Sequence, residues 1–114
     1  MAANAEFRPR TQLDRDQAWT SGDGHLVLRL QRDGNFVLEL DGKAQWQAPG
    51  AWGRGYEVAF EKDGNLYVYD DRDQLVWHAL PLERRNFGGK LRLNEETGKV
   101  EILDQGQEVI WSAP

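Results

Sequence analysis

Residues 30–38 read LQRDGNFVL, and residues 60–68 read FEKDGNLYV. The two stretches share an Asp-Gly-Asn word with apolar residues on both sides, and its first residues, Asp33 and Asp63, are thirty positions apart. A weaker third copy, without this word, spans residues 91–102. Asp, Gly and Asn are ordinary turn residues, and apolar positions that alternate on both sides of a turn are typical of a β-hairpin. The pattern therefore predicts three related hairpins.

A second repeated word follows each hairpin. It reads WQAP at residues 46–49, WHALP at 77–81 and WSAP at 111–114. Turn residues separate the two words, so each unit of about thirty residues reads as strand, turn, strand, turn, strand. Such a short unit cannot bury an apolar face alone, so the three units must share one core around a pseudo-threefold axis. We expect an all-β fold whose core is filled by Trp46, Trp77 and Trp111.

Composition limits the classes of function. The 114 residues suffice for one domain, and 14 Lys and Arg against 19 Asp and Glu give a net charge of −5, which disfavours a nucleic-acid partner. There is no Cys and there are only two His, so we expect no metal, no cofactor and no catalytic residues. No apolar run is long enough to span a membrane, and the first residues lack the apolar stretch of a secretory signal. We expect a soluble protein that is not an enzyme, with a cytoplasmic or unassigned location.

The apolar pattern also sets the register of the first hairpin. Leucines alternate before the turn and apolar residues alternate after it. A two-residue Asp-Gly loop would place a leucine opposite Glu39, whereas a three-residue loop, residues 32–34, pairs Leu30 with Phe36 and brings every apolar residue to one face. Gly34 then supplies the left-handed residue of the turn. The same register fits the second hairpin, and the third requires a four-residue loop.

Polar side chains gather on the opposite face of the first hairpin. Gln31, Asp33 and Asn35 place amide and carboxylate groups near one another, beside the apolar Val37 and with Glu39 further along the strand. Sugar hydroxyls are both donors and acceptors, so a carboxylate with two amides can bind them while an apolar side chain covers the ring C–H groups. The pattern predicts a carbohydrate-binding site that needs no cofactor.

The equivalent positions of the second hairpin form a second candidate site, made of Glu61, Asp63, Asn65, Tyr67 and Tyr69. Glu61 can accept a hydrogen bond from a sugar hydroxyl but cannot donate one, and the bulky Tyr67 is able to fill the pocket. The third unit has Asn94, Glu96 and Gly98 at the nominal positions. We expect this unit to be structural only.

The segment Gln31-x-Asp33-x-Asn35-x-Val37 resembles the mannose-binding signature Gln-x-Asp-x-Asn-x-Val-x-Tyr of the monocot bulb-type, or snowdrop-like, lectins. The organisation into three units that end in Trp, over roughly residues 19–114, resembles their domain as well. The resemblance implies a β-prism II fold, with three four-stranded sheets around a pseudo-threefold axis and one potential mannose pocket per sheet. It also implies that the polar residues of the motif bind mannose hydroxyls and that Val37 lies against the ring carbons.

The resemblance suggests a domain organisation and partners. Residues 1–18 show little periodicity and are interpreted as an N-terminal arm, followed by a lectin domain at 19–114 with units at about 19–49, 50–81 and 82–114. The family's common disulfide is absent because the chain has no Cys, and the family's Tyr position holds Glu39. Many lectins of this type exchange a C-terminal strand, which here would be residues 108–112 and would produce a homodimer. The expected ligands are mannose and mannose-rich glycans.

Other interpretations are open on the sequence alone. Glu39, Glu61 and Tyr67 depart from the motif, which fits a prism whose sugar sites have decayed and that acts as a protein-interaction, structural or antibacterial-targeting module. The carboxylates of both sites could form a glycosidase pair, although they lie near exposed turns. The Asp-rich turns suggest a calcium loop superficially, without the spacing of an EF-hand. A β-trefoil is also threefold, but its units are longer than those found here.

Overall fold

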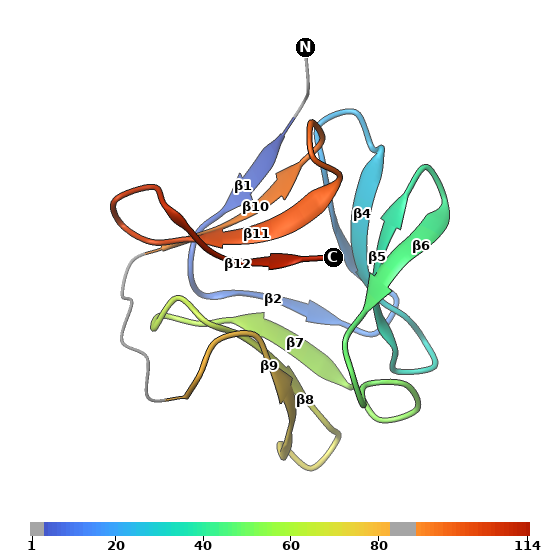
Figure 1. Ribbon diagram of the computed structural model, residues 1–114. Coiled ribbons are helices and arrows are strands. Elements are labelled where there is room, and N and C mark those ends of the chain that lie inside the picture. The colour runs from blue at the N-terminus through green and yellow to red at the C-terminus, as the bar shows by residue number, and fades with distance from the viewer. Residues whose placement is uncertain (1–3, 83–88) are drawn as a thin grey trace.

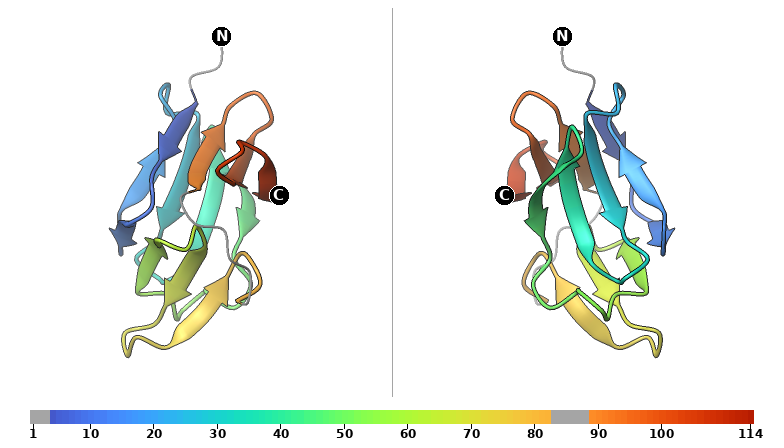
Figure 2. Two further views of the ribbon diagram at one scale, coloured as in Figure 1. Left: turned by 90° about the vertical axis from the view of Figure 1, so that its left-hand side faces the viewer. Right: turned by 90° about the vertical axis from the view of Figure 1, so that its right-hand side faces the viewer.

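The computed structural model describes residues 4–82 and 89–114. Every regular element in these residues is a β-strand, which confirms the all-β prediction. Figure 1 shows the strands arranged as three sheets around a common centre, and Figure 2 shows that the C-terminus lies at one end face of this prism. The first three residues of the predicted arm, and residues 83–88 of the predicted third unit, lie outside the described residues.

Each sheet contains four antiparallel strands, as the β-prism II prediction requires. The first sheet consists of β3 (Ala18–Thr20), β4 (Leu26–Leu30), β5 (Phe36–Leu40) and β6 (Lys43–Gln47). The second sheet consists of β2 (Thr11–Asp14), β7 (Glu57–Phe60), β8 (Leu66–Tyr69) and β9 (Leu75–His78). The third sheet consists of β1 (Ala5–Phe7), β10 (Lys90–Asn94), β11 (Lys99–Leu103) and β12 (Val109–Ala113).

The central hairpin of each sheet has the predicted register. Leu30 pairs with Phe36 across the three-residue loop of the first sheet, and both side chains are fully buried. The equivalent pair in the second sheet is Phe60 with Leu66. In the third sheet, strands β10 and β11 continue to the pair Asn94 and Lys99, which leaves a four-residue loop. Because side chains alternate along a strand, these registers turn all three apolar faces toward one interior.

The N-terminal segment is part of the prism and is not an arm. Strand β1 pairs with β10 of the third sheet, and β2 pairs with β7 of the second. The first strand of the first sheet, β3, follows directly. These strands have only three or four residues each, which is too short for a period-two pattern to stand out from the sequence. Residues 5–20 therefore supply one edge strand of every sheet, and residues 19–114 alone do not complete the second and third sheets.

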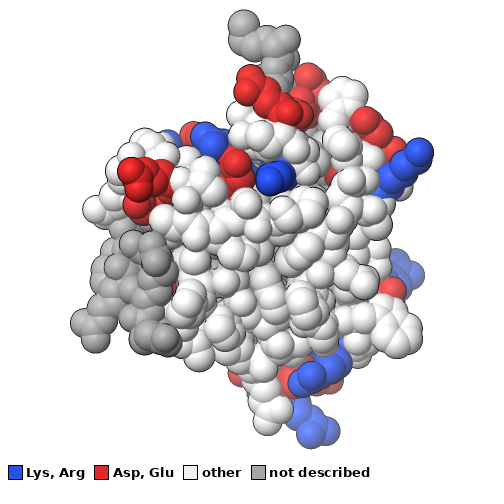
Figure 3. All heavy atoms as spheres, viewed as in Figure 1, with Lys and Arg blue, Asp and Glu red and all other residues white. Residues whose placement is uncertain are grey.

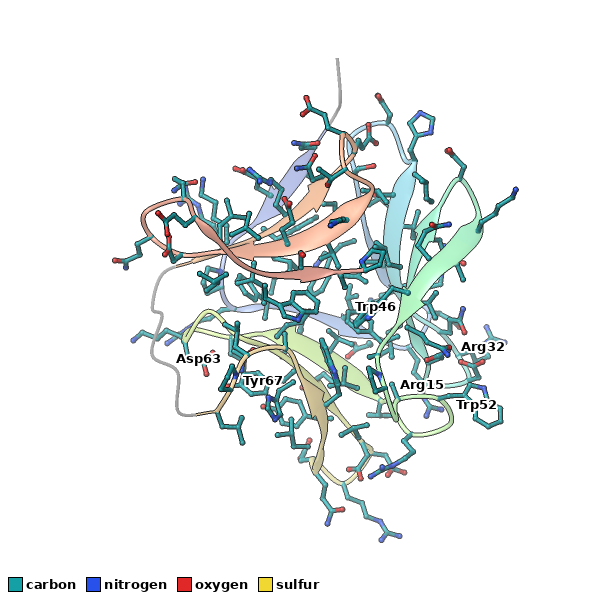
Figure 4. All side chains as sticks on the ribbon, viewed as in Figure 1. Arg15, Arg32, Trp46, Trp52, Asp63 and Tyr67 are labelled. Atoms are coloured by element: carbon teal, nitrogen blue, oxygen red, sulfur yellow. The ribbon has the colours of Figure 1, made fainter. Side chains whose placement is uncertain are left out.

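The core is built mainly from leucine and phenylalanine side chains, with a tryptophan cluster packed against it. Trp46, Trp77 and Trp111 are in mutual contact, with ring centroids 5.4 to 5.8 Å apart, and Figure 4 shows Trp46 between the three sheets. The three rings are partly exposed, whereas Phe36 and Phe60 are fully buried. The tryptophans thus close one end of the core and do not fill its deepest part, in keeping with a large ring that is rarely buried completely.

The C-terminal strand closes the third sheet within the same chain. Strand β12 pairs with β11 from Val109 to Ala113, so the sheet reaches four strands without a partner. Exchange of residues 108–112 between two copies therefore stays a prediction. Figure 3 shows that charged side chains lie mostly toward the edge of the prism end viewed there, and that its middle is uncharged. The described residues contain no helix that could cross a membrane.

Two glycine substitutions test the packing at the first turn. Gly34 and Gly42 both have a left-handed backbone, with φ of +89° and +83°. A Cβ at Gly34 would come within 2.9 Å of the backbone nitrogens of Arg54 and Gly55, whereas a Cβ at Gly42 would meet nothing within 4 Å. We expect Gly42→Ala to lower the free energy of unfolding by about 1 kcal/mol through backbone strain alone, and Gly34→Ala to lower it by about 2–4 kcal/mol.

Urea denaturation of the two variants measures this difference directly. Equal losses would show that the segment around Gly55 does not constrain the first turn.

Candidate functional site

The first hairpin forms a closed turn that presents the predicted polar residues on the outer face of the first sheet. The N–H of Gln31 donates to the carbonyl of Asn35 at 2.8 Å, and the N–H of Gly34 donates to the carbonyl of Gln31 at 2.9 Å. The carboxylate of Asp33 accepts a hydrogen bond from the N–H of Asn35 at 2.9 Å. The turn is therefore fixed by three hydrogen bonds before any ligand arrives.

The side chain of Asn35 is the most informative group of the first hairpin. It is 8% exposed, and its Nδ2 donates to Oε1 of Gln47 on β6 at 2.8 Å. Its Oδ1 is buried and has no hydrogen-bond partner among the described residues. A buried acceptor left unpaired costs about 1–3 kcal/mol. Oδ1 of Asn35 is thus an acceptor that gains from a hydroxyl donor.

Gln47 contacts the predicted site, and sequence reasoning missed it. Its Oε1 holds the amide of Asn35 in one orientation, and its backbone pairs with Val37 across the sheet. The signal available in the sequence was its place directly after Trp46, on the strand predicted to lie beside the motif.

The apolar part of the first site differs from its prediction. Val37 is only 3% exposed, because Arg29 and Gln47 flank it on the two neighbouring strands. Glu39, at the family's Tyr position, has Oε1 3.6 Å from Nε of Arg29. The expected apolar patch at Val37 is therefore largely covered, and an ion pair occupies the place beside it.

In the second hairpin, the equivalent asparagine, Asn65, has a structural role. The N–H of Asn65 donates to the Asp63 carboxylate at 2.9 Å, as in the first hairpin. Its side chain, however, donates to the carbonyl of Leu80 at 3.0 Å and accepts from the N–H of Leu80 at 2.8 Å. Both ends of the Asn65 amide are thereby used to tie the segment after β9 to the hairpin.

Two tyrosines fill the rest of the second site. The hydroxyl of Tyr67 donates to the carboxylate of Asp63, and the hydroxyl of Tyr69 donates to Glu61 at 2.9 Å. The two rings are stacked, with centroids 5.8 Å apart, and Figure 4 shows Tyr67 beside Asp63. Burial and the bond to Asp63 raise the pKa of Tyr67 to about 12, and burial and the bond to Glu61 raise the pKa of Tyr69 as well. Both hydroxyls stay protonated, so protein donors already satisfy the two carboxylates that a sugar would use.

An open groove of about 540 Å³ runs beside the second site, on the β2 and β7 side of the same sheet. Gln12, Ala59 and Glu61 contribute to its lining, whereas Asn65, Tyr67 and Tyr69 do not. The groove therefore shares Glu61 and Asp63 with the predicted site but does not coincide with it.

The third sheet has an ion pair where the first has Val37. Oε1 of Glu101 accepts hydrogen bonds from Nε of Arg92 at 2.8 Å and from Nδ2 of Asn94 at 3.1 Å, and Glu101 is 6% exposed. Oδ1 of Asn94 accepts from the N–H of Glu96 within the four-residue loop, and the N–H of Gly98 donates to the Asn94 carbonyl. The polar groups of this sheet bind one another. Within the described ranges, no group of three or more His, Asp or Glu side chains is arranged to hold a metal ion.

Comparison with known proteins supports the fold through structure alone. No family model matches the sequence, and no curated protein sequence matches it. A lectin of Marasmius oreades superimposes with a TM-score of 0.82 at 23% identity, over 94% of this chain and 87% of that one. A monomeric mannose-binding lectin of the monocot Gastrodia elata superimposes with a TM-score of 0.80 at 23% identity, over 95% and 94%.

The mannose-specific agglutinin of snowdrop bulbs, solved with methyl-α-D-mannoside, superimposes with a TM-score of 0.65 at 19% identity, over 92% of this chain and 85% of that one. At these identities the likeness concerns the fold. Together with the three four-stranded sheets, it shows that the chain has the β-prism II fold of the bulb-type lectins.

Proposed function

We propose that this protein is a non-catalytic lectin that binds mannose or mannose-containing glycans, and that the first sheet carries its working site. The observation that carries the proposal is the buried, unpartnered Oδ1 of Asn35 beside Asp33 in a turn that is already closed. A preformed site loses little conformational entropy when a ligand binds. The lectin structures with the same fold, named for mannose binding, support the choice of sugar.

The chemistry of the first site suits two neighbouring hydroxyls of a pyranose. Oδ1 of Asn35 accepts from one hydroxyl, and the Asp33 carboxylate, which has several lone-pair positions, accepts from the next. The side chain of Gln31, across the hairpin from Asn35, can donate to a sugar oxygen. Hydrogen bonds to a carboxylate are stronger than those between neutral groups, so Asp33 is expected to contribute most.

The other two sheets contribute little to sugar binding in this proposal. The hydroxyls of Tyr67 and Tyr69 occupy the carboxylates of the second site, and Arg92 occupies Glu101 in the third. One chain then offers one shallow site, whose affinity is weak. Homodimer formation by C-terminal strand exchange would present two such sites and raise the avidity for a branched glycan.

The occupied sites on the second and third sheets also favour a second candidate function. A prism in which protein side chains close two of three sites fits an interaction, structural or antibacterial-targeting module that has lost sugar binding. Under this alternative, the Asn35 site would show no saturable response to mannosides.

Replacing Asp33 tests the first site. Asp33→Asn keeps the side-chain oxygen that caps the N–H of Asn35 but removes the charge that strengthens hydrogen bonds to a sugar. We expect the affinity for methyl-α-D-mannoside to fall at least roughly tenfold, since a hydrogen bond to a charged group contributes about 1.5–3 kcal/mol. NMR titration of backbone amides, with the affected residues 31–39 resolved, measures both the affinity and the location.

Asp70→Asn is the matched control for that experiment. Asp70 accepts a hydrogen bond at 2.9 Å from the N–H two residues later, as Asp33 does, but it lies on the turn between β8 and β9. Its replacement should leave mannoside binding unchanged. If the unmodified protein gives no saturable shift with mannoside, the lectin proposal fails and the interaction-module alternative stands.

Restoring the motif on the second sheet tests why that site is closed. Glu61→Gln combined with Tyr67→Val produces the full Gln-x-Asp-x-Asn-x-Val-x-Tyr signature there and releases Asp63 from the Tyr67 hydroxyl. We expect the double variant to bind two mannoside molecules per chain where the original binds one, measured by calorimetry at high protein concentration.

Glu61→Gln alone should bind one molecule, since Tyr67 still covers Asp63. Loss of the Tyr67 ring costs about 2–4 kcal/mol of stability, so circular dichroism must first show that the double variant is folded. A folded double variant that still binds a single molecule would show that Tyr67 is not what closes the second site.

A further inference from the structure

Trp52 is the most exposed large apolar residue of the described chain. It is 72% exposed, in the loop of residues 48–56 between β6 and β7. Figure 4 shows it at the edge of the prism, in the same part of the view as the labelled Arg32 and Arg15. An indole in water at this position contributes nothing to the core, so its exposure needs another explanation.

The exposure of Trp52 is imposed by the loop around it. Ala48 and Ala51 are buried, and the carbonyl of Ala51 accepts from the N–H groups of both Arg54 and Gly55 at 2.9 Å. These contacts anchor the residue directly before Trp52 in the core and close the loop into a tight turn. The loop therefore presents the indole outward from a fixed backbone.

The same loop is packed onto the turn of the proposed sugar site. The N–H of Gly53 donates to the carbonyl of Asp33 at 2.8 Å. A Cβ built on Gly55 would lie 2.3 Å from the carbonyl oxygen of Gly34, so the two backbones are in direct contact. Standard bond lengths around the Gly53 hydrogen bond place the Cα atoms of Trp52 and Asp33 within about 8 Å of each other.

We propose that Trp52 forms a second subsite, on which the sugar unit next to the bound mannose stacks. This inference rests on the proposed function of the first sheet and names its ligand as a disaccharide or longer glycan. The face of a pyranose carries several C–H groups, and a rigid indole offers a large apolar surface with a negative π face toward them. Val37 is covered, so Trp52 supplies the apolar contact that the first sheet otherwise lacks.

The charges near Trp52 fit an uncharged ligand. Nη2 of Arg32 lies 2.8 Å from Oδ2 of Asp16, and Nε of Arg15 donates to the carbonyl of Gly55 at 2.9 Å. The guanidinium of Arg15 also lies over the ring of Tyr56, 5.5 Å from its centroid. Both arginines already have partners within the protein, so neither requires an anionic ligand.

The test compares methyl-α-D-mannoside with an α-linked mannobiose, by calorimetry or NMR titration, on the full chain. The original protein should bind the disaccharide roughly three- to tenfold more tightly than the monosaccharide, the gain expected of one aromatic contact. Trp52→Ala should remove this gain and leave the affinity for methyl-α-D-mannoside unchanged. Trp52→Phe should retain part of the gain, since a smaller aromatic face remains.

Tyr56→Ala is the matched control, because Tyr56 is a 52% exposed aromatic residue of the same loop whose N–H is bonded to the second sheet. Its replacement should leave both affinities unchanged. Tryptophan emission of the original protein, compared with that of Trp52→Ala, gives an independent readout: the part lost with Trp52 should change with the disaccharide and remain constant with the monosaccharide.

The outcomes separate this inference from the proposed function. A Trp52→Ala variant that keeps the disaccharide gain, or an original protein that binds both sugars equally, overturns the Trp52 subsite and leaves the first site standing. A chain that binds neither sugar overturns both proposals. A Trp52→Ala variant that converts a dimer to a monomer in sedimentation, with the disaccharide gain intact, shows that a second copy of the chain covers Trp52.

Discussion

The structure depends on the chain reversal at Asp33 and Gly34 and its equivalent at Gly64. In each, a glycine with positive φ closes a three-residue loop, and the loop length decides which face of the hairpin receives the apolar side chains. A loop shorter by one residue would place the apolar residues of one strand opposite the polar residues of the other, so that neither face is apolar throughout. The same reversal gathers the polar residues of the motif on the outer face, so the core and the candidate site depend on the same turn.

The three sheets show how one scaffold can hold different surface chemistry. All three turn apolar faces inward, yet the polar groups of their outer faces are satisfied differently. In the first sheet, Asn35 keeps a buried acceptor without a partner. In the second, the Tyr67 hydroxyl satisfies Asp63, and in the third, Arg92 satisfies Glu101. Because an unpaired buried polar group is costly, protein donors that reach these positions also exclude a ligand from them.

Sequence reasoning reached the hairpin registers and the place of the motif because both depend on residues close together in the chain. It did not reach the outer strands β1 and β2, which are too short to show a period and pair with strands more than forty positions away. It predicted that Tyr67 is able to fill the second pocket, and the structure adds the partner, Asp63. Sequence reasoning overestimated the exposure of Val37, because the residues that flank it, Arg29 and Gln47, come from neighbouring strands.

The amino-acid sequence on its own determined the all-β class, the three hairpins with their loop lengths, and the residues that face outward on the first two sheets. These follow from side-chain alternation and turn chemistry, which act over a few residues. Tertiary structure decided which outer face keeps a buried acceptor without a partner and which exposed apolar side chain belongs to the loop beside it. Gln47 orients Asn35 from the next strand, and the loop that carries Trp52 meets Asp33 across the sheet edge. Such contacts join segments that are far apart in the chain, and no sequence pattern marks them. They form only once the three sheets have closed around their core.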